Sequence, residues 1–253
     1  PDGKQLGSAD GLAKAMEQSG VFLEAKLLSG QTQQLPQDLK ANLLRLVAQL
    51  LPSLPGAAPL PAASAGNALA QALPAFVRNA LGALGQASLR QQAMSFPLPS
   101  RLLQSMDEEA DLETLLKLAA AAVSRLQTHQ LSSLAQSQLT PEGNLLTTWQ
   151  LELPMRNQQD VVPLQVKLQR EESGAENRKE QKEVLWRIDL AFDLDPLGPL
   201  QVQAQLLRGS LSSQLWAERA ETAQLIDQEL DNLRQRLLGA GLEDRGLARQ
   251  MAA

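Results

Sequence analysis

Apolar residues follow a helical period in the first part of the chain. In residues 10–28 the apolar positions form a helical pattern that Ser19 and Gly20 interrupt. These positions are Leu12, Met16, Phe22, Leu23 and Leu27. Asp38 is a good N-cap for the next helix, because an N-cap carboxylate accepts hydrogen bonds from the free N–H groups of a helix start. The core positions expected in that helix are Leu39, Leu43, Leu46, Val47 and Leu50. Residues 1–51 are therefore predicted to be a helical segment.

The next part of the chain has a different composition. Residues 52–66 are mostly Pro, Ala, Gly and Ser, which is typical of a linker. Residues 67–139 are predicted to be helical again, with short helices in the Ala/Leu-rich stretch 67–92 and a long helix over about 101–137. The apolar face expected for this long helix consists of Leu112, Leu115, Leu116, Leu118, Val123, Leu126 and Leu134.

The period changes from helical to alternating after residues 140–144 (Thr-Pro-Glu-Gly-Asn). Alternation of apolar and polar residues indicates strands with one buried face. Five such strands are predicted, at residues 149–153, 162–168, 186–194, 200–206 and 211–217. A loop is expected at 154–160, where Pro154 ends the first alternation, and a charged, solvated loop is expected at 171–182.

The last predicted element is a helix over about 219–238. It carries one apolar stripe, formed by Ala223, Ile226, Leu230, Leu233 and Leu237. Gly239 or Gly241 would end it. One helix with an apolar stripe and five strands with one apolar face each can bury one another. The fold class predicted is therefore α+β: a helical N-terminal region, then a two-layer domain at 140–253 with about five mostly antiparallel strands on one long helix.

Composition excludes several classes of function. The formal net charge is −5 with no basic block, and aromatic residues make up 3% of the chain with no Tyr, so nucleic-acid binding is not expected. There is no Cys, so disulfides and thiolate chemistry are excluded. No apolar run approaches the roughly 18 residues that span a bilayer, and no signal peptide is visible, so no membrane insertion is expected. The start Pro-Asp-Gly indicates a fragment or a processed chain.

Three features could carry chemistry, and each has a simpler interpretation. His129 is the only His, stands in the long helix, and is expected to be surface-exposed or partly packed, without a ligand set around it. Asp193 and Asp195 could be paired carboxylates, but a strand edge followed by an Asp-Pro turn is favoured. The run from Asp107 to Asp111 fits a helix start, because it lacks the Gly of a Ca²⁺ loop. We therefore predict no catalytic residue, no metal site and no cofactor.

The polar faces of the strands are rich in Gln and Ser. Exposed Gln forms hydrogen bonds without the cost of burying a charge, which suits a modest protein–protein contact. Plain solubility explains the same composition equally well, and both interpretations stay open.

Residues from Trp186 to Leu247 resemble the C-terminal domain of flagellar hook-length control proteins (the FliK family). The matching pieces are Leu194-Asp195-Pro196-Leu197-Gly198, Leu200-Gln201-Val202, Leu211 to Trp216, Ala220-Glu221-Thr222, Leu230-Asp231-Asn232-Leu233-Arg234 and Ala240-Gly241-Leu242. Segments 19–27 and 38–40 also resemble a part of longer, proteobacterial members. The sequence departs from the family in a shortened Pro-Leu-Gly turn and in the strand after the helix, which is reduced to Leu242–Leu247 and is not expected to be regular.

This resemblance implies a role in flagellum assembly. Family members are exported by the flagellar type III apparatus, and their N-terminal part helps to measure the hook, which implies contacts with hook and hook-cap proteins. Their C-terminal domain contacts the cytoplasmic domain of the export-gate protein (FlhB-type) and switches export from hook to filament subunits. The family-motif positions in this chain are Pro196, Leu197, Gly198, Val202, Leu230, Leu233 and Gly241, expected to be mostly structural. The partner surface is not marked by the motif.

The resemblance also implies a location, namely the cytoplasm followed by export during hook assembly. Two other interpretations remain open at this point. One is a cytoplasmic adaptor or regulator with the same domain, and the other is an enzyme with an unrecognised site, which would need His129 or Asp193.

Overall fold

The computed structural model describes residues 1–50, 112–157, 160–173 and 183–251. These form two compact units. Residues 13–131 are named the N-terminal unit, and residues 1–12 together with 132–253 are named the C-terminal unit. The predicted linker 52–66, the predicted helices within 67–92, the acidic run Asp107–Asp111 and the first part of the predicted long helix lie outside the described residues.

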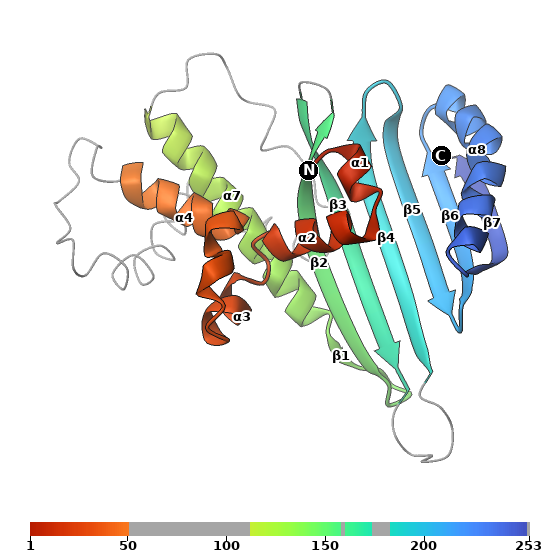
Figure 1. The fold of residues 1–253 in the computed structure, drawn as a ribbon, viewed down its shortest axis with the longest axis horizontal. Helices are drawn as coiled ribbons and strands as arrows, with labels where there is room; N and C mark the ends of the chain where they lie inside the picture. The colour runs from red at the N-terminus through yellow and green to blue at the C-terminus, as the bar shows by residue number, and fades with distance from the viewer. Residues whose placement is uncertain (51–111, 158–159, 174–182, 252–253) are drawn as a thin grey trace. The chain divides into compact units, whose positions relative to one another are not determined.

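Helices make up the described N-terminal part of the chain (Figure 1). They are α1 (Gly3–Leu6), α2 (Ala9–Gln18), α3 (Leu23–Leu28), η1 (Thr32–Gln37), α4 (Leu39–Leu50) and α7 (Leu112–Ala135). The expected interruption at Ser19 and Gly20 is confirmed, and Gly20 has a positive φ of 91°, a conformation that favours glycine. Asp38 caps α4 as predicted, because the backbone N–H of Ala41 donates to its Oδ1 at 3.1 Å.

The core of the N-terminal unit joins α4 to α7. Val47 of α4 packs with Leu116 and Ala119 of α7. The predicted apolar faces are too wide, because Leu27 of α3 and Leu134 near the end of α7 are exposed. Ala and Leu occur all around α7, so composition does not define which arc of the helix is covered.

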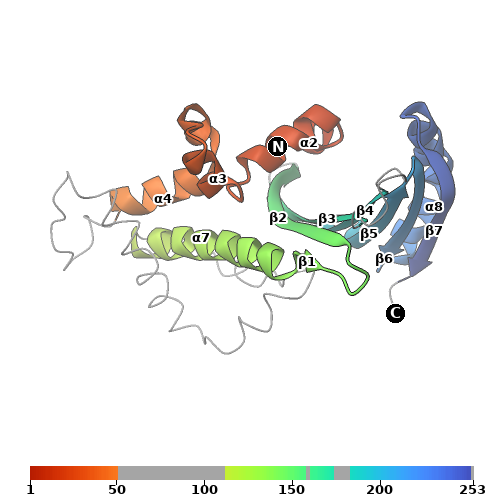
Figure 2. The ribbon, with the colours of Figure 1, turned by 90° about the horizontal axis from the view of Figure 1, so that it is seen from below.

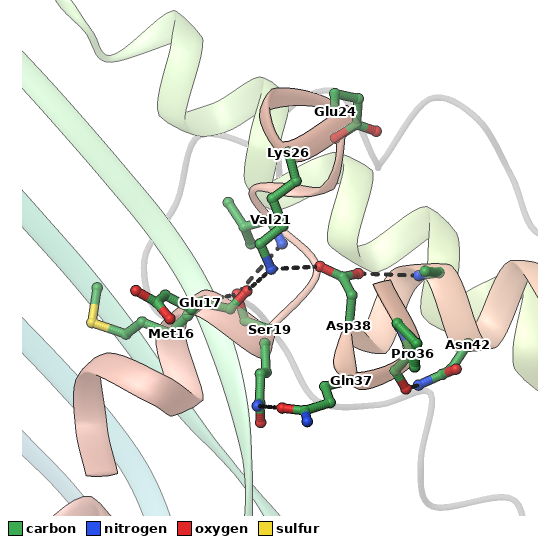
Figure 3. A network of polar contacts seen from close by, with 12 residues as sticks. Met16, Glu17, Ser19, Val21, Glu24, Lys26, Pro36, Gln37, Asp38 and Asn42 are labelled. Carbon is green, nitrogen blue, oxygen red and sulfur yellow. Dashed lines mark hydrogen bonds and ion pairs between the residues drawn. The ribbon is translucent and has the colours of Figure 1, made fainter. Parts of the chain in front are cut away.

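A buried ion pair holds α3 to the start of α4 (Figure 3). The Lys26 Nζ lies 3.1 Å from the Asp38 Oδ2, and both side chains are buried. Lys26 also donates to the backbone carbonyl of Glu17. Asp38 thus serves two groups at once, the cation of Lys26 and the N-terminus of α4.

A second polar cluster lies around Lys40, which is buried as well. Its Nζ pairs with Glu24 and donates to the Oε1 of Gln130 on α7 at 2.7 Å. The Gln130 Nε2 lies 2.7 Å from both the Val21 carbonyl and the Glu24 Oε2. Partial burial would raise the pKa of Glu24, but the hydrogen bonds from Lys40 and Gln130 outweigh it, so the pKa is lowered.

The C-terminal unit is built on one seven-stranded sheet, with strands in chain order (Figure 1). The strands are β1 (Gln138–Leu139), β2 (Leu145–Asn157), β3 (Asp160–Glu172), β4 (Val184–Leu194), β5 (Gly198–Leu207), β6 (Ser210–Ala217) and β7 (Glu243–Met251). All neighbours are antiparallel except β6 and β7, which are parallel and are connected by α8 (Ala220–Gly239). The α+β class is confirmed, but the predicted count of five strands is wrong.

The expected loop at 154–160 is mostly strand, because β2 runs to Asn157 and β3 begins at Asp160. Pro154 lies directly opposite Pro163 in this hairpin. Proline lacks a backbone donor, so it fits a strand only where that donor has no ladder partner. The N–H of Gln150 points to the outer side of β2, and with a period of two residues Pro154 faces the same side. Pro154 is thus tolerated, and Pro163 lies outside the paired stretch of β3 and β4, which begins at Gln165.

The strand after α8 is also longer and more regular than expected. Residues from Glu243 to Met251 pair along β6, with one register shift between Leu211 and Ser212. The expectation of a reduced, irregular strand at Leu242–Leu247 is therefore wrong. The sequence of β7 lacks strict alternation, and its pairing comes from the crossover through α8, which brings the chain back alongside β6.

The outer edge of β2 is covered by groups from other elements. β1 pairs with β2 only at Leu145 and Leu146. Beyond it, the Ser137 hydroxyl accepts from the N–H of Thr148 at 2.9 Å, and the Ser133 hydroxyl accepts from the N–H of Gln150 at 2.7 Å. Near the other end of β2, the N–H of Arg156 donates to the Pro1 carbonyl at 2.9 Å. Uncovered edges invite pairing with other chains, so these groups protect this side of the sheet.

Candidate interaction surface

The turn before β5 is hydrogen-bonded to residues at the start of α8. The Thr222 hydroxyl donates to the Leu197 carbonyl at 2.6 Å, and the Arg219 Nη1 donates to the Pro196 carbonyl at 2.6 Å. Leu197 packs against a core cluster made by β5, β6 and α8, which consists of Leu200, Ala217 and Ala223 with Phe192 and Ile226 beside them. Pro196 is exposed, while Gly198 is buried. The turn thus positions α8 on the sheet.

The other family-motif positions lie in or beside the packing of α8. Leu230 and Leu233 are half-buried, as are Ile226 and Leu237, whereas most other positions of α8 are exposed, so the predicted stripe is confirmed. The helix lies against β6 and β7 rather than across five strands (Figure 2). Val202 is half-buried on β5, opposite Leu215 of β6.

Gly241 ends α8, as one of the two predicted glycines. Its φ is 79°, its N–H donates to the Leu238 carbonyl at 2.9 Å, and the next N–H, of Leu242, donates to the Leu237 carbonyl at 3.0 Å. This pair of bonds is a Schellman motif, which satisfies the last carbonyls of a helix.

We expect Gly198→Ala to destabilise the C-terminal unit by about 1–2 kcal/mol, the cost of the left-handed conformation for a residue with a Cβ. Gly198 has φ 75°, and an added Cβ would lie 2.7 Å from the Arg219 Nε, so the side chain that holds the turn would have to move. Urea unfolding followed by Trp fluorescence measures the effect. Gly239→Ala is the matched control, because nothing lies near its added Cβ, and a similar loss there would contradict the explanation.

The Gln-rich polar face predicted from sequence lies on β5 and β6. The register places Gln203 opposite Gln214 and Gln205 opposite Ser212, and all four side chains are exposed. An uncharged polar face of a sheet remains open to solvent here.

Asp189 of β4 borders this face and is ionisable. It lies directly opposite Gln203 and, on the other side, Lys167. Partial burial raises the pKa of Asp189, while the charges of Lys167 and Arg187 and a hydrogen bond with Gln203 oppose the rise without cancelling it.

We expect Asp189→Asn to become more stabilising, relative to wild type, as pH rises. A carboxyl whose folded pKa is raised contributes fully below its unfolded pKa and loses that contribution as pH rises through the folded value. Ionised Asp189 therefore costs stability above the ordinary value of 3.8, and Asn has no such cost. Urea unfolding below and above that pH measures the difference between the two proteins, and a constant difference would contradict the prediction.

An aromatic pair on the other face of the sheet was missed by the sequence reasoning. Trp149 of β2 and Trp186 of β4 stack with their ring centroids 6.3 Å apart and an interplanar angle of 20°. The Arg170 guanidinium of β3 lies 5.6 Å from the Trp186 ring centroid. Both Trp positions appear in the sequence as core-facing, but only the pairing of β2, β3 and β4 brings them together. They are half-buried rather than buried.

The candidate catalytic residues are not assembled into a site. His129 is fully buried on the inner stripe of α7, so the expectation of a surface or partly packed His is wrong. It falls in that stripe because its spacing from Val123 and Leu126 continues the buried arc. Asp193 and Asp195 are both exposed, at the end of β4 and in the turn after it. In the described part of the chain, no three His, Cys, Asp or Glu side chains are grouped to hold a metal ion.

None of the helices in the described ranges is long and apolar enough to cross a membrane. The fold defines the C-terminal unit as an α+β domain, with a sheet of seven strands and helix α8 against β6 and β7. Residues 174–250, which include β4, β5, β6, α8 and most of β7, match the family model for flagellar hook-length control protein FliK. The resemblance seen between Trp186 and Leu247 is thereby confirmed. No curated protein and no solved structure matches the chain.

Proposed function

We propose that this protein controls flagellar hook length, and that its C-terminal domain binds the cytoplasmic domain of the export-gate protein and switches type III export from hook to filament subunits. The observation that carries the proposal is the family match over residues 174–250, which begins just before β4 and runs almost to the end of β7. In this proposal the N-terminal helical part contacts hook and hook-cap proteins. The protein acts first in the cytoplasm and is then exported during hook assembly.

The physical properties of the chain support export in an unfolded state. It has no Cys, so no disulfide can hold it folded. A domain of this size has a free energy of unfolding of about 5–15 kcal/mol, which an export motor can overcome. The buried polar clusters of Lys26 and Lys40 add specific polar contacts to the N-terminal unit.

Deletion of the gene tests the proposal most directly. We expect overlong hooks in electron micrographs of the deletion strain, normal hooks after complementation, and the full-length protein in the culture medium of an export-competent strain. Normal hooks together with no secretion would contradict the proposal and favour the cytoplasmic adaptor, the alternative that shares the domain.

Binding is measured separately, by titration of the export gate's purified cytoplasmic domain into the full 253-residue chain. Saturable one-to-one heat is the expected result. Its absence, with both proteins folded, would remove the export-gate contact from the proposal while leaving hook-length control itself to the deletion experiment.

A further inference from the structure

We propose that Trp149, Trp186 and the arginines beside them form a docking surface for an acidic, leucine-bearing segment of a partner protein. This surface, here named the tryptophan ridge, is defined by Trp149, Arg170, Trp186, Leu206 and Arg208. The inference deepens the proposed function, because it says which part of the C-terminal unit meets the partner and what the partner's segment must carry.

The apolar part of the ridge is a row of side chains across neighbouring strands. Trp186 is directly opposite Leu206, and Leu206 is directly opposite Leu211. These side chains are all half-buried, while the core cluster under α8 lies at the other end of β5, at Leu200. Trp is enriched in protein interfaces because its large ring combines an apolar body with a polar N–H.

Tryptophan is rare in this chain, so the stacking of two tryptophans at one place supports a role for them. The chain has three Trp in 253 residues, and two of them stack on one another at this half-open position. The pair bridges β2 and β4 over β3, and Arg170 adds a cation–π contact to Trp186. Trp and Arg are the residues most often found where interface binding energy concentrates.

Charge at this end of the sheet indicates the sign of the partner. Two Arg–Glu pairs lie beside the ridge: Arg170 with Glu172, and Arg208 with Glu183. In each pair the arginine side chain is the more exposed member, at 41% against 23% and at 71% against 45%. The groups that a partner would meet first are therefore guanidiniums, on a chain whose net charge is −5.

Exposed guanidiniums beside an apolar row of side chains can bind a partner segment in which carboxylates alternate with apolar residues. A guanidinium binds a carboxylate through two parallel hydrogen bonds, and complementary charge raises both specificity and association rate. Glu243 is also exposed near the β5–β6 turn, but its carboxylate is engaged by the Ser210 hydroxyl at 3.4 Å. An acidic segment would thus compete with Glu172 and Glu183 for arginines that already face outward.

The tryptophan ridge lies partly inside and partly outside the residues that match the family model. Trp186, Leu206 and Arg208 lie within residues 174–250, whereas Trp149 and Arg170 lie on β2 and β3, before it. The additional strands of this chain therefore complete a surface that the matched region has only in part.

The test uses the full chain and a labelled synthetic peptide in which Glu and Leu alternate, with fluorescence anisotropy as the readout. We expect saturable binding that weakens as salt is added, because exposed charges are screened. A twin peptide with Lys in place of Glu is expected not to bind. Equal binding of both peptides, or none of either, would overturn the inference.

Two variants locate the binding, and one serves as a control. The combined change Arg170→Gln and Arg208→Gln, and separately Trp186→Leu, are each expected to weaken binding by roughly tenfold or more. Leu keeps an apolar side chain at 186, so the sheet is retained. Arg156→Gln removes one positive charge at the far end of β2, away from the ridge, and is expected to leave binding unchanged. Each variant is accepted only if its urea midpoint equals that of wild type.

The same variants are then titrated with the export gate's cytoplasmic domain. Parallel weakening supports the inference. If wild type and variants bind this domain equally well, the ridge is not its docking surface, although the proposed function survives. If wild type binds the acidic peptide but not the gate domain, the ridge is kept as a docking surface for acidic segments and the export-gate contact is rejected. Self-association in sedimentation that the arginine changes abolish would assign the ridge to a second copy instead and overturn the inference.

Discussion

Asp38→Asn is expected to destabilise the N-terminal unit by about 3–5 kcal/mol, the cost of removing one partner of a buried ion pair. Asn keeps an oxygen to accept from the Ala41 N–H, so the cap of α4 is retained and the lost group is the negative charge beside Lys26. Lys26 is then left buried with the Glu17 carbonyl as its remaining acceptor. Urea unfolding of the full chain, followed by far-UV circular dichroism, measures the loss.

The double change Lys26→Met and Asp38→Asn tests whether the loss in Asp38→Asn comes from the unpaired charge of Lys26. It removes both charges, so no uncompensated charge is left buried, and most of the lost stability is expected to return. Asp10→Asn, at an exposed position of α2, is the control and is expected to change stability by no more than about 0.5 kcal/mol. A small effect of Asp38→Asn, or a double variant as unstable as the single one, would mean that the ion pair does not hold α3 to α4.

Leu151→Ala is expected to destabilise the C-terminal unit by about 2–5 kcal/mol, the usual range for truncating a buried Leu to Ala. Leu151 is at 0% exposure in the middle of β2, directly opposite the buried Val166 of β3. The truncation leaves a cavity on the longest hairpin of the sheet. All three Trp lie in the sheet of this unit, at 149, 186 and 216, so Trp fluorescence during urea unfolding follows the affected part.

Val161→Ala is the control for this prediction. Val161 is 63% exposed on the adjoining strand β3, and its truncation removes almost no buried surface. Its urea midpoint is expected to stay close to that of wild type. Equal losses for Leu151→Ala and Val161→Ala would show that the measurement reports strand propensity rather than core packing.

Part of the fold was predictable because local rules determine it. The N-cap at Asp38, the break at Gly20, the end of α8 at Gly241 and the turn at Arg208 and Gly209 all follow from backbone preferences of a few neighbouring residues. The turn is a two-residue hairpin with positive φ at both positions, the kind that matches the twist of the strands it joins.

The errors occurred where local signals were silent or misleading. Pro154 indicated a loop, but its missing donor faces the edge of the sheet, so the strand continues through it. His129 indicated a polar position, yet it continues the buried arc of α7. The sequence of β7 has no clean alternation, and α8 brings it to β6.

Of the two candidate surfaces, only the Gln-rich polar face of β5 and β6 was predictable from the sequence. Gln203, Gln205 and Gln214 alternate with apolar residues, so their exposure follows from the period of a strand. The stacking of Trp149 on Trp186 depends on the register of three strands whose pairing spans many residues of chain.

The sequence by itself thus determined the element types, most caps and turns, the helix stripe of Leu230 and Leu233 and the family resemblance, because these depend on spacing within a few residues. Only the tertiary structure decided that the sheet has seven strands, that Ser133 of α7 and Ser137 after it cover the edge of β2, and that Trp149, Trp186 and Arg170 share one face. The physical reason is that strand order and register are fixed by contacts between residues far apart in the chain, and these contacts leave no periodic signal in any single segment.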